Sequence, residues 1–274
     1  MRIFIIMMIL LGSANYADAQ KQRITFNDLY AYPMVGDIQL SPDGKNIIYM
    51  LTEYDTADGS SSSALWMIDS KGGEPEKIIE DTMGVSHPRW SPDGKDIAYI
   101  SRRDEKSQVI VRNIKSGKSR QATSISTGAS GVEWSPDAEK LIFVSRVFPD
   151  CESDSCNRKR QEQLDNRKSS GKLYSDLPVR HYNHWVGEKT SRLFIHDLEN
   201  DTVYSITPGD YRVPPIALAG GGSYKFSPDG DEICFVMNTD SSLELSTNND
   251  LFIVSAEGGT YTRITGNPAN DAAP

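Results

Sequence analysis

Histidine and cysteine are the residue types in this chain that could do metal or redox chemistry. His181 and His184 lie three residues apart in the segment Val-Arg-His-Tyr-Asn-His-Trp. Two histidines at that spacing could bind a metal ion together on one face of a helix. The segment follows a proline and we expect it to be extended, so the two rings would point in different directions. We therefore expect no metal site and no cofactor.

Cys151 and Cys156 form a second pair, five residues apart in the polar stretch Asp-Cys-Glu-Ser-Asp-Ser-Cys. Half-cystines this close can meet at the Cα separation of a disulfide, about 4.4–6.8 Å. An oxidising compartment favours such a bridge. We predict a Cys151–Cys156 disulfide.

The sequence contains no motif of a complete catalytic centre. The Gly-x-Ser-x-Gly elbow of an α/β-hydrolase is absent, and no strand-helix-strand stretch is present to hold one. The chain also has no His-Glu-x-x-His, P-loop, dinucleotide fingerprint or Cys-x-x-Cys. The chain alone is therefore predicted not to be an enzyme.

The charge of the chain argues against a nucleic-acid partner. Its formal net charge is −9 over 274 residues, whereas a nucleic-acid surface needs clustered lysine and arginine. The basic run 158–160 is diluted at once by Glu162 and Asp165. We interpret this run as a solvated loop or helix face.

The first residues differ in character from the rest of the chain. Arg2 precedes an apolar run from Ile3 to Leu11, and Ala-Asp-Ala at 17–19 supplies a small-x-small cleavage pattern. This run is too short to span a bilayer of about 30 Å. We expect residues 1–19 to be a signal peptide, with no membrane span after its removal and a secreted or periplasmic mature protein. A retained N-terminal anchor is the alternative.

A repeated tetrapeptide organises the mature chain. Ser-Pro-Asp-Gly begins at Ser41, Ser91 and Ser227, and Ser-Pro-Asp-Ala at Ser135, with spacings of 50, 44 and 92 residues. The shorter spacings match the period of about 40–50 residues of propeller blades. One β-prone segment precedes each copy and three follow it, which predicts four-stranded blades.

The repeat predicts an all-β chain with four blades, roughly at 35–82, 83–126, 127–210 and 220–266. The long spacing places an insertion at 148–189, inside the third blade. Long loops on a repeat scaffold are usually functional. The tetrapeptide itself suits a tight hairpin turn, with the serine hydroxyl as a cap, so its aspartates are not expected to bind metal.

The alignment of the repeats also interprets Cys234. It occupies the central-strand position that Ile48, Ala98 and Ile142 hold in the other units. We expect a buried structural thiol there. A catalytic cysteine would need a histidine partner, and the flanking residues offer none.

The repeated Ser-Pro-Asp-Gly units resemble TolB-like propeller repeats. Three further segments are more specific: Thr25 to Leu29, Leu177 to Trp185, and Ser246 to Phe252. With the signal peptide they resemble the N-terminal propeller of secreted dipeptidyl-peptidase V-like enzymes, which belong to the prolyl oligopeptidase family of serine peptidases.

This resemblance implies a propeller, typically of seven blades, that covers a C-terminal hydrolase domain and admits only short peptides. The region 20–274 would then be a partial TolB-like propeller, truncated before the hydrolase domain of a parent serine dipeptidyl peptidase. Short peptides would be its partners through that missing domain. Because the fourth blade would lack a neighbour, homo-oligomers are also possible.

The resemblance directs attention to the insertion, because related enzymes hold the free amine of the substrate with an acidic residue from a propeller insertion. The substrate-binding residues expected here are Asp176, Arg180, His181, Trp185 and Glu188. Two alternatives stay open. One is a stand-alone TolB-like periplasmic scaffold that binds other proteins, and the other is a small-ligand propeller enzyme with histidines and carboxylates at its central channel.

Overall fold

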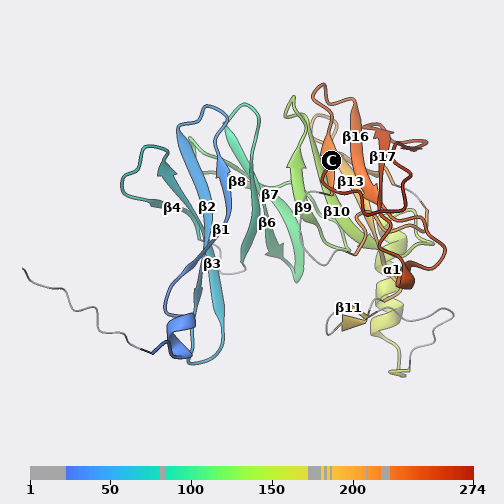
Figure 1. Cartoon of the computed structure of the whole chain (residues 1–274), viewed down its shortest axis with the longest axis horizontal. Helices are drawn as coiled ribbons and strands as arrows, with labels where there is room; N and C mark the ends of the chain where they lie inside the picture. Colours follow the sequence, from blue (N-terminus) through green and yellow to red (C-terminus); the bar gives the residue numbers. More distant parts are fainter. Residues whose placement is uncertain are drawn as a thin grey trace, which may run out of the picture.

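The computed structural model describes residues 23–80, 84–171, 180–181, 184–185, 187–207, 209–216 and 223–274. These residues form four antiparallel four-stranded sheets, which stand beside one another like the blades of a fan (Figure 1). The expected signal peptide, residues 1–19, lies outside the described residues. The prediction of an all-β chain with four-stranded blades is confirmed.

Each sheet is an up-and-down meander, and we call the sheets blades 1 to 4 in chain order. Blade 1 contains β1 (Met34–Leu40), β2 (Asn46–Tyr54), β3 (Ser61–Asp69) and β4 (Glu76–Glu80). Blade 2 contains β5 (Val85–Trp90), β6 (Asp96–Arg103), β7 (Lys106–Asn113) and β8 (Ser119–Gln121). Blade 3 contains β9 (Ser130–Trp134), β10 (Lys140–Val147), β13 (Thr190–Asp197) and β14 (Thr202–Ser205). Blade 4 contains β15 (Tyr224–Phe226), β16 (Glu232–Met237), β17 (Asp250–Ser255) and β18 (Thr262–Arg263).

The smaller elements lie at the ends of the blades. The helix α1 (Asp154–Asp165) and the two-residue strands β11 (Arg180–His181) and β12 (His184–Trp185) belong to the insertion. Two short 3-10 turns, η1 (Asn27–Leu29) and η2 (Leu243–Leu245), complete the described elements. None of the helices in the described ranges is long and apolar enough to cross a membrane.

The tetrapeptide turns join the first strand of each blade to the second. In all four copies the serine Oγ donates a hydrogen bond of 2.5–2.7 Å to the aspartate Oδ1. The same Oγ accepts the backbone N–H five residues later, at 2.8–2.9 Å. The fourth position has a positive φ in each copy, and Ala138 adopts φ 63° where the others have glycine. The aspartates therefore serve the turn.

A threonine closes the outer side of three blades. Its hydroxyl accepts a backbone N–H of the third strand, 2.9 Å away in each case. The pairs are Thr123 with Val109, Thr207 with Leu193, and Thr265 with Leu251. Because a buried unpaired N–H is costly, this hydroxyl fixes the edge where the short fourth strand ends.

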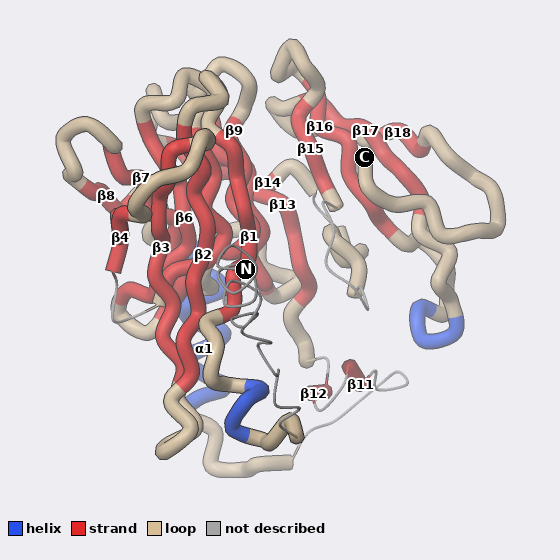
Figure 2. The backbone as a smooth tube through the Cα atoms, turned by 60° about the vertical axis from the view of Figure 1, so that its left-hand side comes forward, coloured by secondary structure: helices blue, strands red, loops and turns tan. Residues whose placement is uncertain are grey.

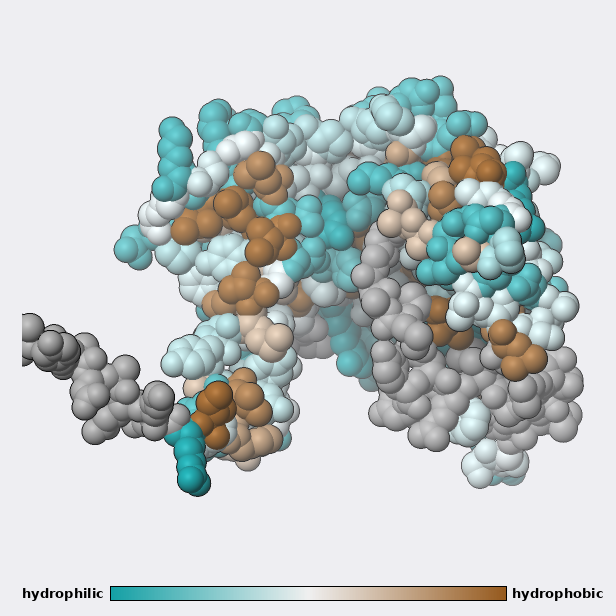
Figure 3. Space-filling view, viewed as in Figure 1, coloured by the Kyte–Doolittle hydropathy of each residue, from teal (hydrophilic) through white to brown (hydrophobic). Residues whose placement is uncertain are grey.

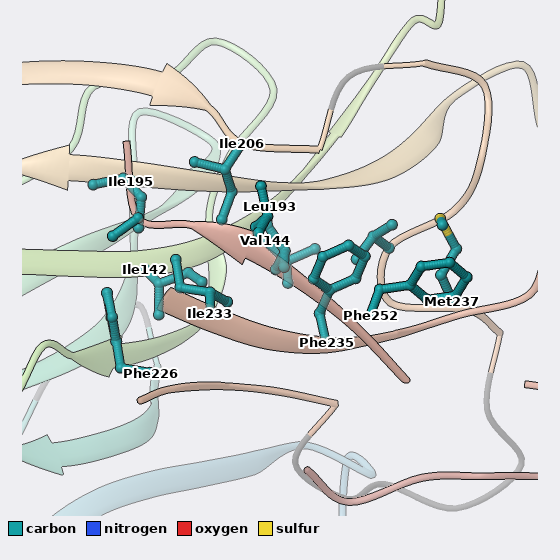
Figure 4. Close-up of a cluster of buried hydrophobic side chains, with 13 residues drawn as sticks. Ile142, Val144, Leu193, Ile195, Ile206, Phe226, Ile233, Phe235, Met237 and Phe252 are labelled. Atoms are coloured by element: carbon teal, nitrogen blue, oxygen red, sulfur yellow. The ribbon is translucent and has the colours of Figure 1, made fainter. Parts of the chain in front are cut away.

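The core consists of three apolar layers, one between each pair of neighbouring blades. Alternate residues of one strand serve different layers, because successive side chains point to opposite faces. On β6, Ile97 packs toward blade 1 and Ala98 toward blade 3. Figure 4 shows the layer between blades 3 and 4, where Leu193 and Phe235 face each other. Full burial of each large side chain contributes about 1.5–3 kcal/mol.

Cys234 is half-buried, so the prediction of a buried thiol is wrong. It lies on β16 opposite Ile253, on the face that points away from blade 3. Ile48, Ala98 and Ile142 are fully buried at the matching position because the next blade covers them. Within the described residues no further sheet covers Cys234. Its partial burial raises the pKa of the thiol.

Blade 1, at the other end of the fan, also has exposed apolar side chains. Apolar side chains along β1 are more than half exposed, namely Met34, Val35, Ile38 and Leu40. Figure 3 shows apolar residues following the blade on this side of the molecule. Both end sheets therefore keep the strand pattern of the other blades, but each has apolar side chains that no neighbouring blade covers.

Candidate functional site

The insertion leaves blade 3 after β10 and returns at β13. Val147 and Thr190 are the last paired residues, so the two ends of the insertion lie directly opposite each other in the sheet. Figure 1 shows α1 and β11 beyond one end of the blades, and Figure 2 shows β11 and β12 on the same side. The expected insertion in the third blade is confirmed, and it projects from one end of the fan.

Local hydrogen bonds fix the first turn of α1. Ser153 caps the helix by accepting the backbone N–H of Cys156 at 3.2 Å. Asn157 is buried and its Oδ1 accepts the backbone N–H of Phe148 at 2.8 Å. Asp154 accepts the backbone N–H of Ser126, from the link between blades 2 and 3. The helix is therefore anchored to the blade at its N-terminal end.

Cys151 and Cys156 are joined by a disulfide, with a Cα separation of 5.4 Å. The bridge ties the turn after β10 to the first turn of α1. A cavity of about 370 Å³ opens beside it, between Asp150 and the side chains of Lys159 and Gln163. Both the disulfide and the helix thus border a concave surface at the insertion end.

Arg160 is the most connected side chain of α1. Its guanidinium lies 2.7 Å from Asp150 Oδ2 and 3.6 Å from Glu188 Oε2, and it covers the ring of Phe148 at 5.4 Å. The basic run was interpreted as a solvated face. Arg158 and Lys159 are indeed exposed, whereas Arg160 connects the start of the insertion to its end.

The predicted substrate-binding residues are only partly described. Asp176 lies outside the described residues, and Arg180 and His181 are described in their backbone alone. Trp185 has 54% of its surface exposed, which leaves the indole accessible. Glu188 is also exposed but is engaged by Arg160. The structure thus places Trp185 and Glu188 at the same end of blade 3 and does not test a role for any of the five.

The histidine pair departs from expectation in its backbone. His181 and His184 are directly paired residues of the β11–β12 hairpin, so the extended segment does not carry them apart. Periodicity along a single strand did not anticipate this antiparallel pairing. Across the described ranges, no three or more histidine, cysteine, aspartate or glutamate side chains gather closely enough to hold a metal ion.

A second group of charges lies on the inner strands, far from the insertion in sequence. The first strands of blades 1, 2 and 3 are neighbours, and Arg89 on β5 lies between two carboxylates. Its Nε is 2.6 Å from Glu133 Oε1 on β9, and its Nη1 is 2.8 Å from Asp37 Oδ1 on β1. Trp134 Nε1 donates to the carbonyl of Arg89 at 3.1 Å.

Burial lowers the pKa of Arg89, but Glu133 and Asp37 outweigh that effect and raise it. Sequence reasoning did not find this three-blade contact. The signal was weak: Arg89 and Glu133 both stand two residues before the serine of the tetrapeptide. Equivalent positions of neighbouring repeats lie side by side, so opposite charges there predict an ion pair.

Comparison with known proteins supports the propeller fold and a similarity to peptidases. A family model described as TolB beta propeller domain matches residues 47–148. Dipeptidyl-peptidase 5 of Porphyromonas endodontalis is 25% identical over 260 residues, covering 93% of this chain and 37% of that protein. Dipeptidyl-peptidase 5 of Porphyromonas gingivalis is 30% identical over 244 residues, covering 84% of this chain and 34% of that protein.

A solved structure shares the fold. The acylaminoacyl peptidase of Pyrococcus horikoshii superposes with a TM-score of 0.60 at 16% identity, covering 87% of this chain and 33% of that one. This chain therefore spans about a third of the length of the proteins it matches. The resemblance drawn from the sequence motifs is confirmed, since the similar proteins are peptidases and the matched region is propeller-like.

Proposed function

We propose that this chain, a propeller-like region similar to that of dipeptidyl-peptidase 5, admits and positions short peptides for a serine peptidase of the dipeptidyl or oligopeptidase type. In this proposal the blades exclude large folded proteins, and the insertion of blade 3 touches the peptide. The chain works outside the cytoplasm, after removal of a signal peptide at residues 1–19. Hydrolysis belongs to a catalytic domain of the parent protein.

The observation that carries the proposal is the insertion itself. A plain scaffold of repeats needs only a short loop between its second and third strands, as between β6 and β7. Here the same connection holds an anchored helix, a disulfide and a hairpin with an exposed tryptophan. Exposed aromatic side chains on a rigid support are typical of binding surfaces. The similarity to peptidases over most of the chain makes a peptide the proposed ligand.

The five residues expected from the sequence remain the proposed contacts. Trp185 would pack against an apolar side chain of the peptide. Asp176 and Glu188 are the carboxylates proposed for its free amine, with Arg160 holding Glu188 in place. Arg180 and His181 would donate hydrogen bonds to peptide carbonyls.

Calorimetric titration of the purified chain with an alanine tetrapeptide tests the proposal. We expect measurable binding, and at least a fivefold weaker affinity for Trp185→Ala. Tyr32→Ala, which removes an exposed aromatic ring beside blade 1, is the matched control and should bind as the unaltered chain does. Equal affinities for both variants would contradict a role for the insertion.

A dipeptidyl chromogenic substrate tests whether hydrolysis requires the proposed catalytic domain. We expect no turnover by the purified chain. Turnover that a serine-directed inhibitor abolishes would contradict the assignment of hydrolysis to another domain.

A further inference from the structure

Three basic side chains gather where the insertion rejoins blade 3. Arg146 is the last residue but one of β10, Lys189 precedes β13, and Arg212 lies in the segment that follows β14. We call these three the basic cluster. Arg146 pairs with Ser191 in the sheet, and the backbone N–H of Val213 donates to the carbonyl of Ser191 at 2.9 Å. Arg212 Nη1 donates to the carbonyl of Lys189 at 3.1 Å. Backbone geometry therefore holds the three residues together.

The members of the cluster lie close enough to repel one another. Burial, then the charges of Lys106 and Arg146, lower the pKa of Lys189, and Asp165 opposes the shift only in part. Burial and the charge of Arg146 lower the pKa of Arg212. A local excess of positive charge thus exists on a chain whose net charge is −9.

No carboxylate neutralises this excess within the part of the chain that the structure describes. None of the three cations forms an ion pair there; Lys189 covers the ring of Phe148 at 5.0 Å instead. The undescribed stretch 172–179 contains one carboxylate, that of Asp176. One negative charge leaves the cluster positive whatever its position.

A fourth cation at the same end of blade 3 lies on the opposite face of the sheet, because Arg192 pairs with Ser145 whereas Arg146 pairs with Ser191. Arg192 is only 5% exposed, and its Nη2 donates to the carbonyls of Pro149 and Gly209 at 2.8 Å each. Its buried Nε has no hydrogen-bond partner among the described residues. Burial lowers the pKa of Arg192, and the carboxylates of Asp210 and Glu152 offset this only at a distance. Arg192 is therefore held by the two backbone carbonyls and is not a member of the basic cluster.

The chemistry of these groups selects an anion of a particular shape. A guanidinium presents a planar fork of donors that matches a carboxylate with two parallel hydrogen bonds. Lys189 and Arg212 are partly buried, whereas Arg146 is exposed. Solvent screens the attraction of an anion to the two partly buried cations less than its attraction to a surface cation. The cluster lies beside the insertion, where the proposed function places the peptide.

We propose that the basic cluster of Arg146, Lys189 and Arg212 binds the C-terminal carboxylate of the short peptide. This assignment rests on the proposed function, because it supposes that a peptide occupies the insertion end. It makes the propeller selective for peptides with a free acid end, and it sets a limit on peptide length from the distance between cluster and catalytic centre.

Titration of the chain with three matched peptides tests the assignment. The peptides are tetra-alanine with a free acid end, the same peptide with a C-terminal amide, and the amide with glutamate at its third position. We expect the free acid to bind about tenfold more tightly than the plain amide. Raising the salt from about 50 to 500 mM should remove most of this difference, because the Debye length shortens severalfold.

The double variant Arg146→Gln and Lys189→Gln should reduce the tenfold preference to less than twofold. Lys115→Gln with Lys118→Gln is the matched control, since it removes two exposed positive charges at the opposite end of blade 2. The control should keep the preference. An unchanged circular dichroism spectrum and urea midpoint verify that both variants fold.

The outcomes separate the two proposals. Equal binding of acid and amide, or a preference that survives the double variant, overturns the carboxylate site while peptide binding stands. If the glutamate amide binds as tightly as the free acid, the site accepts a side-chain carboxylate and the assignment to the peptide end is overturned. Absence of binding by any peptide overturns the proposed function and this inference with it.

Discussion

Arginine is used in two opposite ways at two places in this molecule. On the inner strands, Arg89 lies between Glu133 and Asp37 and joins three blades. At the insertion end, Arg192 is more deeply buried, yet it donates only to backbone carbonyls. Arg146 and Arg212, nearby, also have no carboxylate partner in the described residues. Arg89 holds the scaffold together, whereas in our proposal Arg146 and Arg212 bind an anion.

The difference teaches where stability and function reside in the fan of blades. A charge that is paired inside the protein stabilises the fold, and removing its partner leaves an uncompensated charge. Mutual repulsion within a cluster of like charges destabilises the fold slightly. Variants at the two places should therefore separate the two roles.

The largest expected effect is on the inner strands. Arg89→Met leaves two partly buried carboxylates without their cation, and it removes the contact between three blades. We expect a loss of about 2–4 kcal/mol in the free energy of unfolding, measured by urea denaturation. A loss below about 0.5 kcal/mol would show that the contact contributes no more than an exposed ion pair. Arg89 would then not differ in its effect on stability from the arginines at the insertion end.

The next effect concerns the anchor of the insertion. Replacing both cysteines, Cys151→Ser with Cys156→Ser, opens a short loop, so the loss should stay below the roughly 3 kcal/mol expected for a 15-residue loop. Thiol counting on the denatured, unreduced chain should find one free cysteine, Cys234. Three free thiols would refute the bridge. The loss of unfolding free energy caused by Arg89→Met should be the same in this variant, because Arg89 and its two carboxylates lie on other strands.

A much smaller effect is expected from Arg146→Gln. Removing one of several mutually repelling charges should change the unfolding free energy by less than about 0.5 kcal/mol, in the stabilising direction. The measurement is the urea midpoint at low salt, where repulsion is least screened. A clear destabilisation would mean that Arg146 is paired in the folded chain, and it would count against an available cation.

The smallest effect belongs to the tetrapeptide turns, whose hydrogen bonds stay within the turn and involve neither Arg89 nor the insertion. Hydrogen bonds from the Lys95 side chain, the Ser91 hydroxyl and the Lys95 backbone lower the pKa of Asp93 to about 2. An aspartate with a lowered pKa stabilises the fold above its unfolded pKa of about 3.9, and this contribution disappears as the pH falls toward 2. The difference in urea midpoint between the unaltered chain and Asp93→Asn should therefore shrink from pH 5 to pH 2. A difference independent of pH would contradict the charge-based account.

Much of the fold was accessible from the sequence because each blade is built from local hairpins. The serine, proline and aspartate of the tetrapeptide fix a turn by contacts within five residues, so the strands on either side could be placed without tertiary information. The β-prone segments at matching distances from the tetrapeptide then indicated the remaining strands. The disulfide was predicted from the spacing and the expected oxidising compartment, and the structure joins the same two residues.

What the sequence did not reveal depends on contacts between blades. Arg89 is 44 residues from Glu133 and 52 from Asp37, and no local pattern links them. Cys234 was predicted to be buried because its position in the repeat is equivalent to Ile142, but burial is decided by the neighbouring sheet. The basic cluster had one overlooked signal, a Ser-Arg pair one residue before the end of the second strand, at Ser101–Arg102 and again at Ser145–Arg146.

The opposed ends of the insertion have a consequence for how this chain can be re-engineered. Since Val147 and Thr190 already face each other across paired strands, the blade supplies the closure of any loop grafted between them. Loop-closure free energy changes by only about 0.6 kcal/mol for each doubling of length, so segments of very different size are interchangeable there. A two-residue Asn-Gly turn could replace the whole segment. The binding segment between Val147 and Thr190 can therefore be exchanged while the four strands of blade 3 are kept.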